Sequence, residues 1–365
     1  MIETALSVLK RLENSGFKAY IVGGFVRDYL LNRKSVDVDI TTNATPQQIK
    51  EIFPESFVPN EIYGSITVIQ NKIRLEITTF RKEIKYYNNR KPLEIEYIDD
   101  LLEDLKRRDF TINTLCMDSN GNIIDLLDGK KDLDNKLIRT IGNSTNKFTE
   151  DALRILRAIR FATVLNFKLD EETKKAIFFT KKYLTNISFN RKKEELDKIF
   201  MSKNSKYGVD LLIELGLDKE LEIYNLKDIK LSNDLLGMWS SLDVNTKYPF
   251  TKSEKELIKK IKIVENLNNL DSQVLYKYGP YVNSIAFINK GGNNIEVINS
   301  YNNLPIKSRS DILISSNEIM ELLNRGPGSY INNIYIDLES KILTGELKND
   351  NDSIRKYILS KYITS

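Results

Sequence analysis

The stretch YIVGGFVRDYLLNRKSVDVDITT, residues 20–42, decides the fold of this 365-residue chain. Its first half is typical of a short apolar strand that runs into Gly23 and Gly24 and then into a helical segment. Paired glycines let a ligand come close to the backbone, and the free N–H groups at a helix start suit an oxyanion. This half therefore predicts a phosphate-binding turn, with Arg27 and Asp28 just behind it.

The second half, VDVDI at residues 36–40, alternates between apolar and acidic side chains. With a period of two, Asp37 and Asp39 share one face of a strand and the apolar residues take the other. Neighbouring carboxylates repel unless a cation lies between them, and oxygen ligands favour a hard ion such as Mg²⁺, which also binds substrate phosphates. Alone, each half is ordinary: a turn, and a solvated strand edge. Together, with Arg27 between them, they indicate a metal–nucleotide site.

Composition excludes several kinds of chemistry. The chain has no histidine, which removes histidine acid–base catalysis, Ser–His triads and histidine-containing metal sites. Its 55 basic and 51 acidic residues give a formal charge of only +4, so a nucleic-acid surface has to come from where the basic residues lie. Carboxylates acting with a metal remain as the expected catalytic groups.

Compartment and partners can also be predicted from the sequence. The one cysteine, Cys116, has apolar neighbours and is expected to be a small core residue. A single cysteine forms no internal disulfide, which fits a reducing cytosol. The N-terminus lacks a signal-peptide pattern, and no apolar run is long enough to span a bilayer. We therefore expect a soluble, cytoplasmic protein with no membrane partner.

Two helices and two strands near the N-terminus have clear local signals. Apolar residues at helical spacing predict a helix over residues 2–14. A capping box of Thr45 and Gln48 starts a second helix. Residues 64–69 and 73–80 are expected to form two strands around an Asn-Lys turn. An early helix followed by mixed strands and helices favours an α+β domain.

The motifs GGFVRDYLL and DVDITT resemble the signature of the class II family of CCA-adding tRNA nucleotidyltransferases and bacterial poly(A) polymerases. The resemblance implies an α+β, polymerase-β-like nucleotidyltransferase head with a mixed sheet, followed by an all-helical neck, body and tail. We expect the bacterial type, since no segment resembles a phosphohydrolase domain. The predicted boundaries are a catalytic head at 1–142, a nucleotide-selecting neck at 143–205, a body at 206–300 and a tRNA-binding tail at 301–365.

Glu76, on the second predicted strand, has two interpretations. A lone strand glutamate usually faces solvent. A two-metal phosphoryl-transfer site, however, commonly uses a further carboxylate, and EITTFR resembles the family segment that supplies it. By that resemblance Glu76 is a third catalytic carboxylate.

Two further segments of the head have family counterparts. Residues 82–96 have loop composition; they are either an ordinary hairpin loop or, by resemblance, the mobile loop around Arg90 that is needed to add the final adenosine. RRDFTIN at residues 107–113 starts with what could be a solvated arginine pair, but it resembles the family's sugar-and-phosphate motif. In that case Arg108 contacts the triphosphate, while Asp109 and Asn113 read the ribose.

TEDALRILRAIRF at residues 149–161 has a strong helix pattern, with Asp151, Arg154, Arg157 and Arg160 at every third position. These charges are either surface ion pairs or a slanting ridge that binds a ligand. A carboxylate accepts hydrogen bonds and a guanidinium donates them. The pair at 151 and 154 can therefore match the amino group and ring nitrogen shared by cytosine and adenine, and reject uracil and guanine. In the resembling family this pair is a protein template, and the two later arginines lean towards phosphate or the RNA end.

The C-terminal half is predicted to be helical. Residues 188–196 resemble a family helix that buttresses the template helix, and residues after 301 resemble a tail that grips the tRNA elbow. Phosphate contacts there would make binding salt-dependent. The candidate contacts are Lys307, Arg309, Arg325, Lys341 and Lys348.

The expected activity is addition of CCA to the 3′ end of tRNA from CTP and ATP, without a nucleic-acid template and with release of pyrophosphate. The expected macromolecular partner is tRNA, contacted at its 3′ end and elbow, and the expected cofactor is Mg²⁺. The protein itself is expected to be a monomer or a homodimer. Alternatives are a bacterial poly(A) polymerase, a CC- or A-adding relative, a small-molecule nucleotidyltransferase and an idle RNA-binding module. The predicted catalytic residues are Asp37, Asp39 and Glu76, with the first two as metal ligands; the predicted nucleotide-binding residues are Gly23, Gly24, Arg27, Arg108, Asp109, Asn113, Asp151, Arg154, Arg157 and Arg160.

Overall fold

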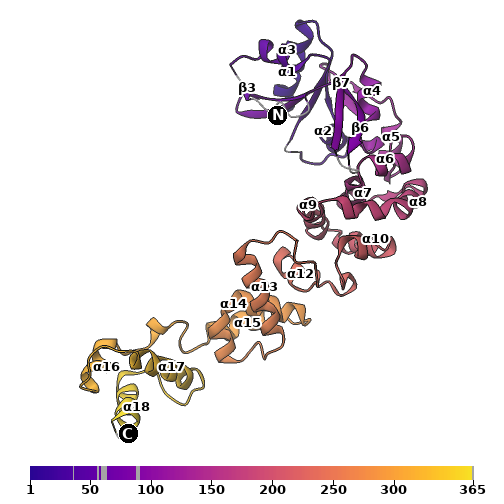
Figure 1. Ribbon diagram of the computed structural model, residues 1–365. Helices are drawn as coiled ribbons and strands as arrows, with labels where there is room; N and C mark the ends of the chain where they lie inside the picture. Colours follow the sequence, from indigo (N-terminus) through magenta and orange to yellow (C-terminus); the bar gives the residue numbers. More distant parts are fainter. Residues whose placement is uncertain (36, 56, 59–63, 88–90, 364–365) are drawn as a thin grey trace. The chain divides into compact units, whose positions relative to one another are not determined.

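A computed structural model of the protein describes residues 1–365 except 36, 56, 59–63, 88–90 and 364–365 (Figure 1). The described residues form two compact units. Unit 1 contains Met1–Lys227 and Val244–Pro249, and unit 2 contains Asp228–Asp243 and Phe250–Ser365. The finer division into head, neck, body and tail stays a prediction.

Unit 1 begins with strands and helices mixed and continues with helices. Its strands are β1 Ala19–Val22, β2 Asp39–Thr42, β3 Phe57–Val58, β4 Ser65–Gln70, β5 Ile73–Thr79, β6 Arg81–Tyr87, β7 Lys91–Tyr97, β8 Cys116–Met117, β9 Ile123–Ile124, β10 Leu137–Ile138 and β11 Lys168–Leu169. Its helices are α1 Ile2–Asn14, α2 Gly24–Leu30, α3 Pro46–Ile52, α4 Leu101–Lys106, η2 Thr111–Asn113, α5 Gly129–Asp134, α6 Ser144–Glu150, α7 Leu153–Leu165, α8 Glu171–Thr180, η3 Lys181–Asn186, α9 Phe189–Phe200, α10 Ser205–Glu214 and α11 Asp218–Leu221.

A mixed sheet organises the head, with the strand order β3-β4-β5-β2-β1-β8-β9 among the described residues. Strand β2 pairs antiparallel with β1 and parallel with β5. Val22, at the end of β1, pairs with Asp39 at the start of β2. The glycine turn that follows Val22 and the two aspartates therefore meet at one edge of the sheet, where a phosphate and a metal can be held together.

Several local predictions are confirmed. Helix α1 spans the predicted residues, and Thr45 and Gln48 form the capping box that starts α3. The β4–β5 hairpin turns at Asn71 and Lys72, which both have positive φ, as the tight turn of a twisted hairpin requires. Cys116 is fully buried beside Val22 and Leu105, and burial raises the pKa of its thiol to about 12.

Three predicted elements differ in the structure. The strand expected at residues 36–40 begins only at Asp39, and Val36 lies outside the described residues. Most of the loop expected at 82–96 belongs to two antiparallel strands, β6 and β7, because backbone pairing between the two strands outweighs the loop-like composition. Arg90 also lies outside the described residues.

The third difference is a break in the predicted template helix. Helix α6 ends at Glu150, Asp151 has extended dihedral angles (φ −143°, ψ 103°), and α7 begins at Leu153. The physical reason is local competition: the Asp151 carboxylate accepts the N–H of Leu153, the first residue of α7, at 3.0 Å. Asp151 therefore lies at a helix junction, whereas Arg154, Arg157 and Arg160 lie on α7.

Helix α7 packs against several helices of unit 1. It packs against α9 and α10, and most of its apolar residues are buried. Packing against α10 is especially close at Gly208, where an added Cβ would overlap Thr163 and Ile199. At the sheet side, Phe161 of α7 meets Phe110 edge to face, with ring centroids 5.7 Å apart. These contacts fix the arginines of α7 relative to the head.

Unit 2 contains helices throughout its described residues. They are α12 Leu235–Ser240, α13 Lys252–Glu265, α14 Ser272–Asn289, α15 Asn294–Asn302, η5 Arg309–Asp311, α16 Ser316–Leu322, α17 Tyr330–Leu343 and α18 Asn351–Tyr362. Helix α14 is kinked at Gly279, which has a non-helical backbone before Pro280. Ile334, Leu338 and Ile354 belong to one apolar core that joins α17 and α18. This confirms the predicted helical composition of the C-terminal region.

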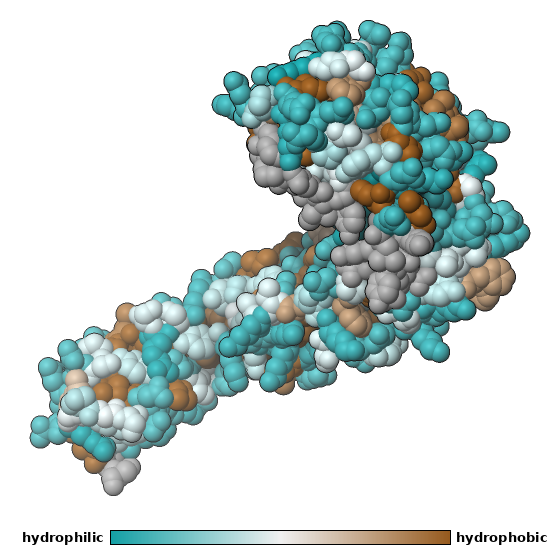
Figure 2. Space-filling view, turned by 45° about the horizontal axis from the view of Figure 1, so that its top comes forward, coloured by the Kyte–Doolittle hydropathy of each residue, from teal (hydrophilic) through white to brown (hydrophobic). Residues whose placement is uncertain are grey.

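On the face shown in Figure 2, hydrophilic residues predominate and apolar residues occur in small scattered groups. Across the described parts of the chain, every helix is too short or too polar to cross a bilayer.

Candidate active site

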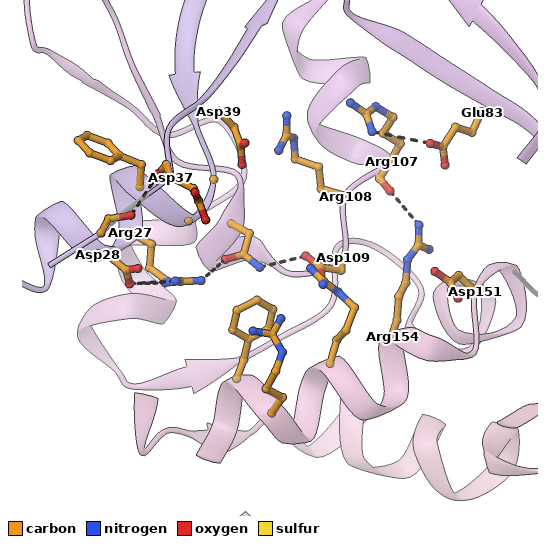
Figure 3. Close-up of a pocket in the computed structure, with 18 of the residues that line it drawn as sticks. Arg27, Asp28, Asp37, Asp39, Glu83, Arg107, Arg108, Asp109, Asp151 and Arg154 are labelled. Carbon is orange, nitrogen blue, oxygen red and sulfur yellow. Dashed lines mark hydrogen bonds and ion pairs between the residues drawn. The ribbon is translucent and has the colours of Figure 1, made fainter. Parts of the chain in front are cut away.

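A pocket of about 680 Å³ in unit 1 brings most of the predicted site residues together (Figure 3). The sheet edge, the glycine turn, the RRDFTIN segment and the start of α7 all contribute to it. The predicted residues that line it are Gly23, Gly24, Arg27, Asp37, Asp39, Arg108, Asp109, Asn113, Asp151, Arg154, Arg157 and Arg160. Glu76 is the one predicted residue that is not among the lining side chains.

Glu76 nevertheless lies beside the aspartates. It is exposed, and it pairs with Asp39 across the parallel strands β2 and β5. Residues paired in this way lie on the same face of adjacent strands, about 4.8 Å apart along the hydrogen-bonding direction. Asp37, Asp39 and Glu76 therefore form an acidic edge.

The electrostatics of this edge fit a cation. Burial of its carboxyl group raises the pKa of Asp39, the charges of Glu76 and Asp37 raise it further, and Arg108 opposes the rise. A carboxylate that is hard to ionise beside two like charges is stabilised by a positive ion. Within the described residues no cluster of three acidic, cysteine or histidine side chains forms a complete metal cage. Mg²⁺ does not need one, because it usually binds through one or two carboxylates plus substrate phosphates and water.

The glycine turn lies against two arginines. Gly23 has φ of 79°, a conformation that strains an L residue, and its N–H donates to the Leu115 carbonyl at 3.2 Å. A Cβ at Gly23 would lie 3.5 Å from Nη1 of Arg108, and one at Gly24 would lie 3.8 Å from Nη2 of Arg27. The turn thus keeps bare backbone next to positive charge.

A hydrogen-bonded chain runs from helix α2 to the RRDFTIN segment. Arg27 donates to the Asp28 carboxylate from Nε at 3.0 Å and from Nη2 at 2.9 Å, and to Oδ1 of Asn113 from Nη1 at 2.8 Å. Asn113 in turn donates to Oδ1 of Asp109 at 3.0 Å. Because each group is held by the next, Asn113 has a fixed orientation at the wall of the pocket.

Arg157 extends this chain to helix α7. Its Nε donates to Oδ2 of Asp109 at 2.8 Å. Burial alone would raise the pKa of Asp109, but the Arg157 charge and the bonds from Asn113 and Arg157 outweigh it and hold the pKa well below its ordinary value. Asp109 is therefore a firmly ionised, buried acceptor.

Asp151 and Arg154 lie in the same pocket, but they are not each other's ion-pair partners. Arg154 pairs with Glu150, with Nη1 2.7 Å from the carboxylate, and it also donates to the carbonyls of Lys147 at 3.1 Å and Arg107 at 3.0 Å. Burial raises the pKa of Asp151, while the nearby Arg154 lowers it. Arg154 is thus held by Glu150 and by two backbone carbonyls, so Asp151 and Arg154 can each contact a ligand separately.

Sequence reasoning missed Phe161. Its ring has three guanidinium groups around it, with Cζ of Arg160 4.0 Å, Arg27 5.1 Å and Arg157 5.4 Å from the ring centroid. Guanidinium groups are attracted to aromatic faces at such distances. The signal in the sequence was the aromatic residue that directly follows the third arginine of the ridge.

Other missed residues position arginines. Glu195 of α9 accepts from Nε of Arg160 at 2.6 Å, a contact between residues 35 positions apart. Glu83 and Arg107 also line the pocket, and their side chains are 3.7 Å apart. Only the resemblance of residues 188–196 to a buttressing helix pointed towards Glu195, and no local pattern marked Glu83.

A mixed sheet with paired aspartates at its edge, a glycine turn and six arginines around one pocket defines this protein as a nucleotidyltransferase with a polymerase-β-like head. Comparison with known families agrees: residues 19–139 match the poly A polymerase head domain, 166–222 match the probable RNA and SrmB-binding site of polymerase A, and 246–358 match the putative domain 2 of tRNA nucleotidyltransferases. The chain belongs to the CCA-adding enzyme family, on the evidence of its full-length relatives.

Two of those relatives carry the assignment. The chain is 36% identical to the CCA-adding enzyme of Ligilactobacillus salivarius, over 95% of this chain and 94% of the relative. It is 34% identical to that of Bacillus subtilis, over 97% of each. The predicted family is therefore confirmed.

Solved structures confirm the predicted fold class. The Bacillus stearothermophilus CCA-adding enzyme in complex with CTP superposes with a TM-score of 0.83 at 26% identity, over 99% of this chain and 98% of that one. The Thermotoga maritima enzyme complexed with tRNA has a TM-score of 0.75 at 22% identity, over 98% and 95%, a likeness of fold alone.

Proposed function

We propose that this protein adds two cytidines and one adenosine to the 3′ end of tRNA. The tRNA 3′-hydroxyl attacks the α-phosphate of CTP, then of CTP again and then of ATP, and each step releases pyrophosphate. One observation carries the proposal: Asp37 and Asp39 line the same pocket as Arg108 and as Asp151 and Arg154. This shared lining supports a site in which the two aspartates are catalytic, Arg108 binds the triphosphate, and Asp151 and Arg154 read the base.

Asp37 and Asp39 are the proposed ligands of Mg²⁺, with Glu76 as an accessory carboxylate on the neighbouring strand. When bound, the ion would favour ionisation of the attacking hydroxyl and neutralise charge on the leaving pyrophosphate. The protein's own part is to hold two carboxylates at one edge of a rigid sheet. Burial raises the pKa of Asp39, and the charges of Glu76 and Asp37 raise it further, so a positive ion at this edge would be stabilising.

The glycine turn and Arg108 are proposed to bind the triphosphate. Gly23 and Gly24 leave the backbone open to phosphate oxygens, and Arg108 lies directly across from Gly23. Arg27 adds positive charge behind the turn, and its bond to Asn113 keeps that amide in place. Fixed donors of this kind stabilise the charge that develops as pyrophosphate leaves.

Asp109 and Asn113 are proposed to recognise the ribose, and Asp151 and Arg154 to select the base. Asp109 stays ionised and can accept hydrogen bonds from sugar hydroxyls. Asp151 can accept from an exocyclic amino group, and Arg154 can donate to an unprotonated ring nitrogen. Cytosine and adenine share this pattern, so the same two residues would serve all three additions.

The RNA would bind at the part of the pocket lined by Arg157 and Arg160, and along the helical C-terminal region. Of the predicted tail contacts, Arg309 is paired with Glu339 and Lys341 with Glu346. These two would have to exchange partners to meet phosphate. We propose that the protein is cytoplasmic. Its substrates would be tRNA as the acceptor, and CTP and ATP as the nucleotide donors.

The test is an incorporation assay on tRNA that lacks its 3′ end, with each nucleotide alone and with CTP plus ATP. Addition of two C and then one A is the expected result. The double variant Asp37→Ala/Asp39→Ala should abolish incorporation, while Asp134→Ala, an exposed aspartate of α5 outside the pocket, should leave it unchanged.

Each other outcome contradicts the proposal in a defined way. Long A tracts on generic RNA would assign the protein as a poly(A) polymerase. Addition of C without A would restrict it to CC addition. A folded wild type that adds nothing to any acceptor would leave the helical region as an RNA-binding scaffold.

A further inference from the structure

Asp104 of α4 is a fully buried carboxylate just outside the pocket, with a relative exposure of 0%. Ionised groups are rarely placed in a protein interior unless they are paired and hydrogen-bonded. The nucleotide chemistry described above does not involve Asp104 directly, since its side chain does not line the pocket. Its role must therefore depend on the residues that donate hydrogen bonds to its carboxylate.

Four donors from three segments converge on this one carboxylate. Oδ1 accepts from Nε of Arg107 at 2.8 Å and from the backbone N–H of Arg81 at 3.2 Å. Oδ2 accepts from the hydroxyl of Thr41 at 3.2 Å and from Nη2 of Arg108 at 3.4 Å. Strand β2, the start of β6 and the end of α4 are thereby joined at a single point.

The surroundings of Asp104 favour its ionised form. Burial alone would raise the pKa of Asp104, but the charges of Arg107 and Arg108 and the bonds from Arg107 and Arg81 hold it below its ordinary value. The carboxylate is thus a fixed negative charge. A fixed charge in a low-dielectric interior orients a neighbouring guanidinium strongly.

Arg107 and Arg108 both line the pocket, and Arg108 is the one that lies against the glycine turn. Its Nε is buried and has no hydrogen-bond partner among the described residues. The 3.4 Å bond to Asp104 is long for a charge-assisted contact. Arg108 therefore makes only a long bond to Asp104, and its Nη1 lies beside the glycine turn, where a phosphate oxygen could accept from it.

The same carboxylate supports the other two parts of the site. Thr41 lies two residues after Asp39 on β2. The carbonyl of Arg107 accepts from Nη2 of Arg154 at 3.0 Å. Both of these links are indirect, whereas Arg108 joins Asp104 directly to the expected triphosphate site, so the effect of Asp104 on nucleotide binding is expected mainly through Arg108.

We infer that Asp104 is a positioning residue for the nucleotide triphosphate, which acts by holding the guanidinium of Arg108 towards the phosphates. The inference rests on the proposed function, in which Arg108 binds the triphosphate of both CTP and ATP. It predicts that loss of the Asp104 charge weakens both nucleotides equally, because Arg108 contacts a part that they share.

The experiment measures Mg²⁺-dependent binding of CTP and of ATP to the full-length wild type, Asp104→Asn, Arg108→Ala and the double variant. We expect Asp104→Asn to weaken both nucleotides about tenfold, the scale of a lost charge-assisted hydrogen bond. In the Arg108→Ala background the same substitution should have almost no further effect, because its route of action is gone.

A matched control separates positioning from loss of stability. Asp132 is equally buried, in α5, and accepts from Thr111 at 2.5 Å and from Arg139, but it does not contact Arg108. Asp132→Asn should lower the melting temperature as Asp104→Asn does and leave CTP affinity unchanged. If Asp104→Asn does not fold, Thr41→Val removes one donor to the same oxygen, and about threefold weaker binding is expected.

The outcomes distinguish the inference from the function it rests on. Asp104→Asn that binds both nucleotides like the wild type, while Arg108→Ala binds them weakly, would overturn the inference and leave the proposed function intact. Arg108→Ala with wild-type affinity would overturn the assignment of Arg108 itself. Additive effects in the double variant would show that Asp104 acts by another route and would also reject the inference.

Discussion

Arg157 of α7 and Asp109 of the RRDFTIN segment form one ion pair, in which Nε and Nη2 of the arginine lie 2.8 and 2.7 Å from the same carboxylate oxygen. The two residues are 48 positions apart in the chain. One comes from the segment proposed to read the sugar, and the other from the helix proposed to face the RNA. The ion pair therefore links the RRDFTIN segment to helix α7 across the pocket.

This pair makes stability depend on pH in a defined direction. Because the pKa of Asp109 is depressed in the folded state, ionised Asp109 stabilises the fold above its unfolded pKa of about 3.9, and this stabilisation is lost as the pH falls towards the lower folded value. Chemical denaturation at pH 5 and pH 3 should show a smaller change in unfolding free energy for Asp109→Asn than for the wild type. At pH 7 the variant should be less stable by about 3 kcal/mol, since Arg157 is left unpaired. Equal pH slopes for the two proteins would contradict the assignment.

Asp151 should determine which bases are accepted. Asp151→Asn replaces an acceptor with a group that both donates and accepts, so it removes the basis for rejecting uracil. We expect the ratio of kcat/KM for CTP over UTP to fall at least about tenfold, with overall folding unchanged. Single-nucleotide incorporation with CTP and UTP measures this ratio. Asp134→Asn, which changes an exposed aspartate outside the pocket, should preserve the wild-type ratio, and a preserved ratio in Asp151→Asn would rule out its role.

Phe161 should stabilise both the fold and the arginine cluster. Phe161→Leu removes the ring around which Arg27, Arg157 and Arg160 gather and leaves space in the interior. A loss of about 1–2 kcal/mol in unfolding free energy is expected, together with weaker CTP binding. The matched control is Phe179→Leu, at a phenylalanine that is 70% exposed, where a change within about 0.5 kcal/mol is expected. Urea denaturation and CTP titration test both, and identical behaviour of the two variants would be the contrary result.

Gly129 should tolerate no side chain. A Cβ there would overlap the carbonyl oxygen of Thr111, because α5 packs directly on η2. Gly129→Ala is expected to destabilise the head by about 1–3 kcal/mol through overpacking. Gly326→Ala, at a position with open space around it, should have little effect. Thermal denaturation of the two variants distinguishes a packing requirement from a general cost of replacing glycine.

The parts of the site that were predictable are those whose signals are local. Gly23, Gly24, Asp37 and Asp39 lie close together in the chain, and all four line the pocket, although the strand predicted to carry both aspartates begins only at Asp39. The position of Glu76 beside Asp39 depends on the register between strands β2 and β5. This register could not be predicted from either strand alone, because it depends on which strands pair.

The parts that were not predictable depend on long-range contacts or on local competition. Nothing within α7 indicates that Arg160 is paired with Glu195, or Arg157 with Asp109. The break at Asp151 was missed because helix propensity favoured a continuous helix, while one side-chain bond to Leu153 ends it. Strands β6 and β7 were assigned as loop from their composition, although pairing between them overrides it.

The buried thiol of Cys116 has a practical consequence. With its pKa raised to about 12 and its side chain closed to solvent, it should be inert to maleimides and similar reagents at neutral pH. Since it is the chain's one cysteine, a second cysteine introduced at any exposed position would be the sole reactive handle. A fluorophore or spin label could therefore be attached at a chosen surface site without first redesigning the interior.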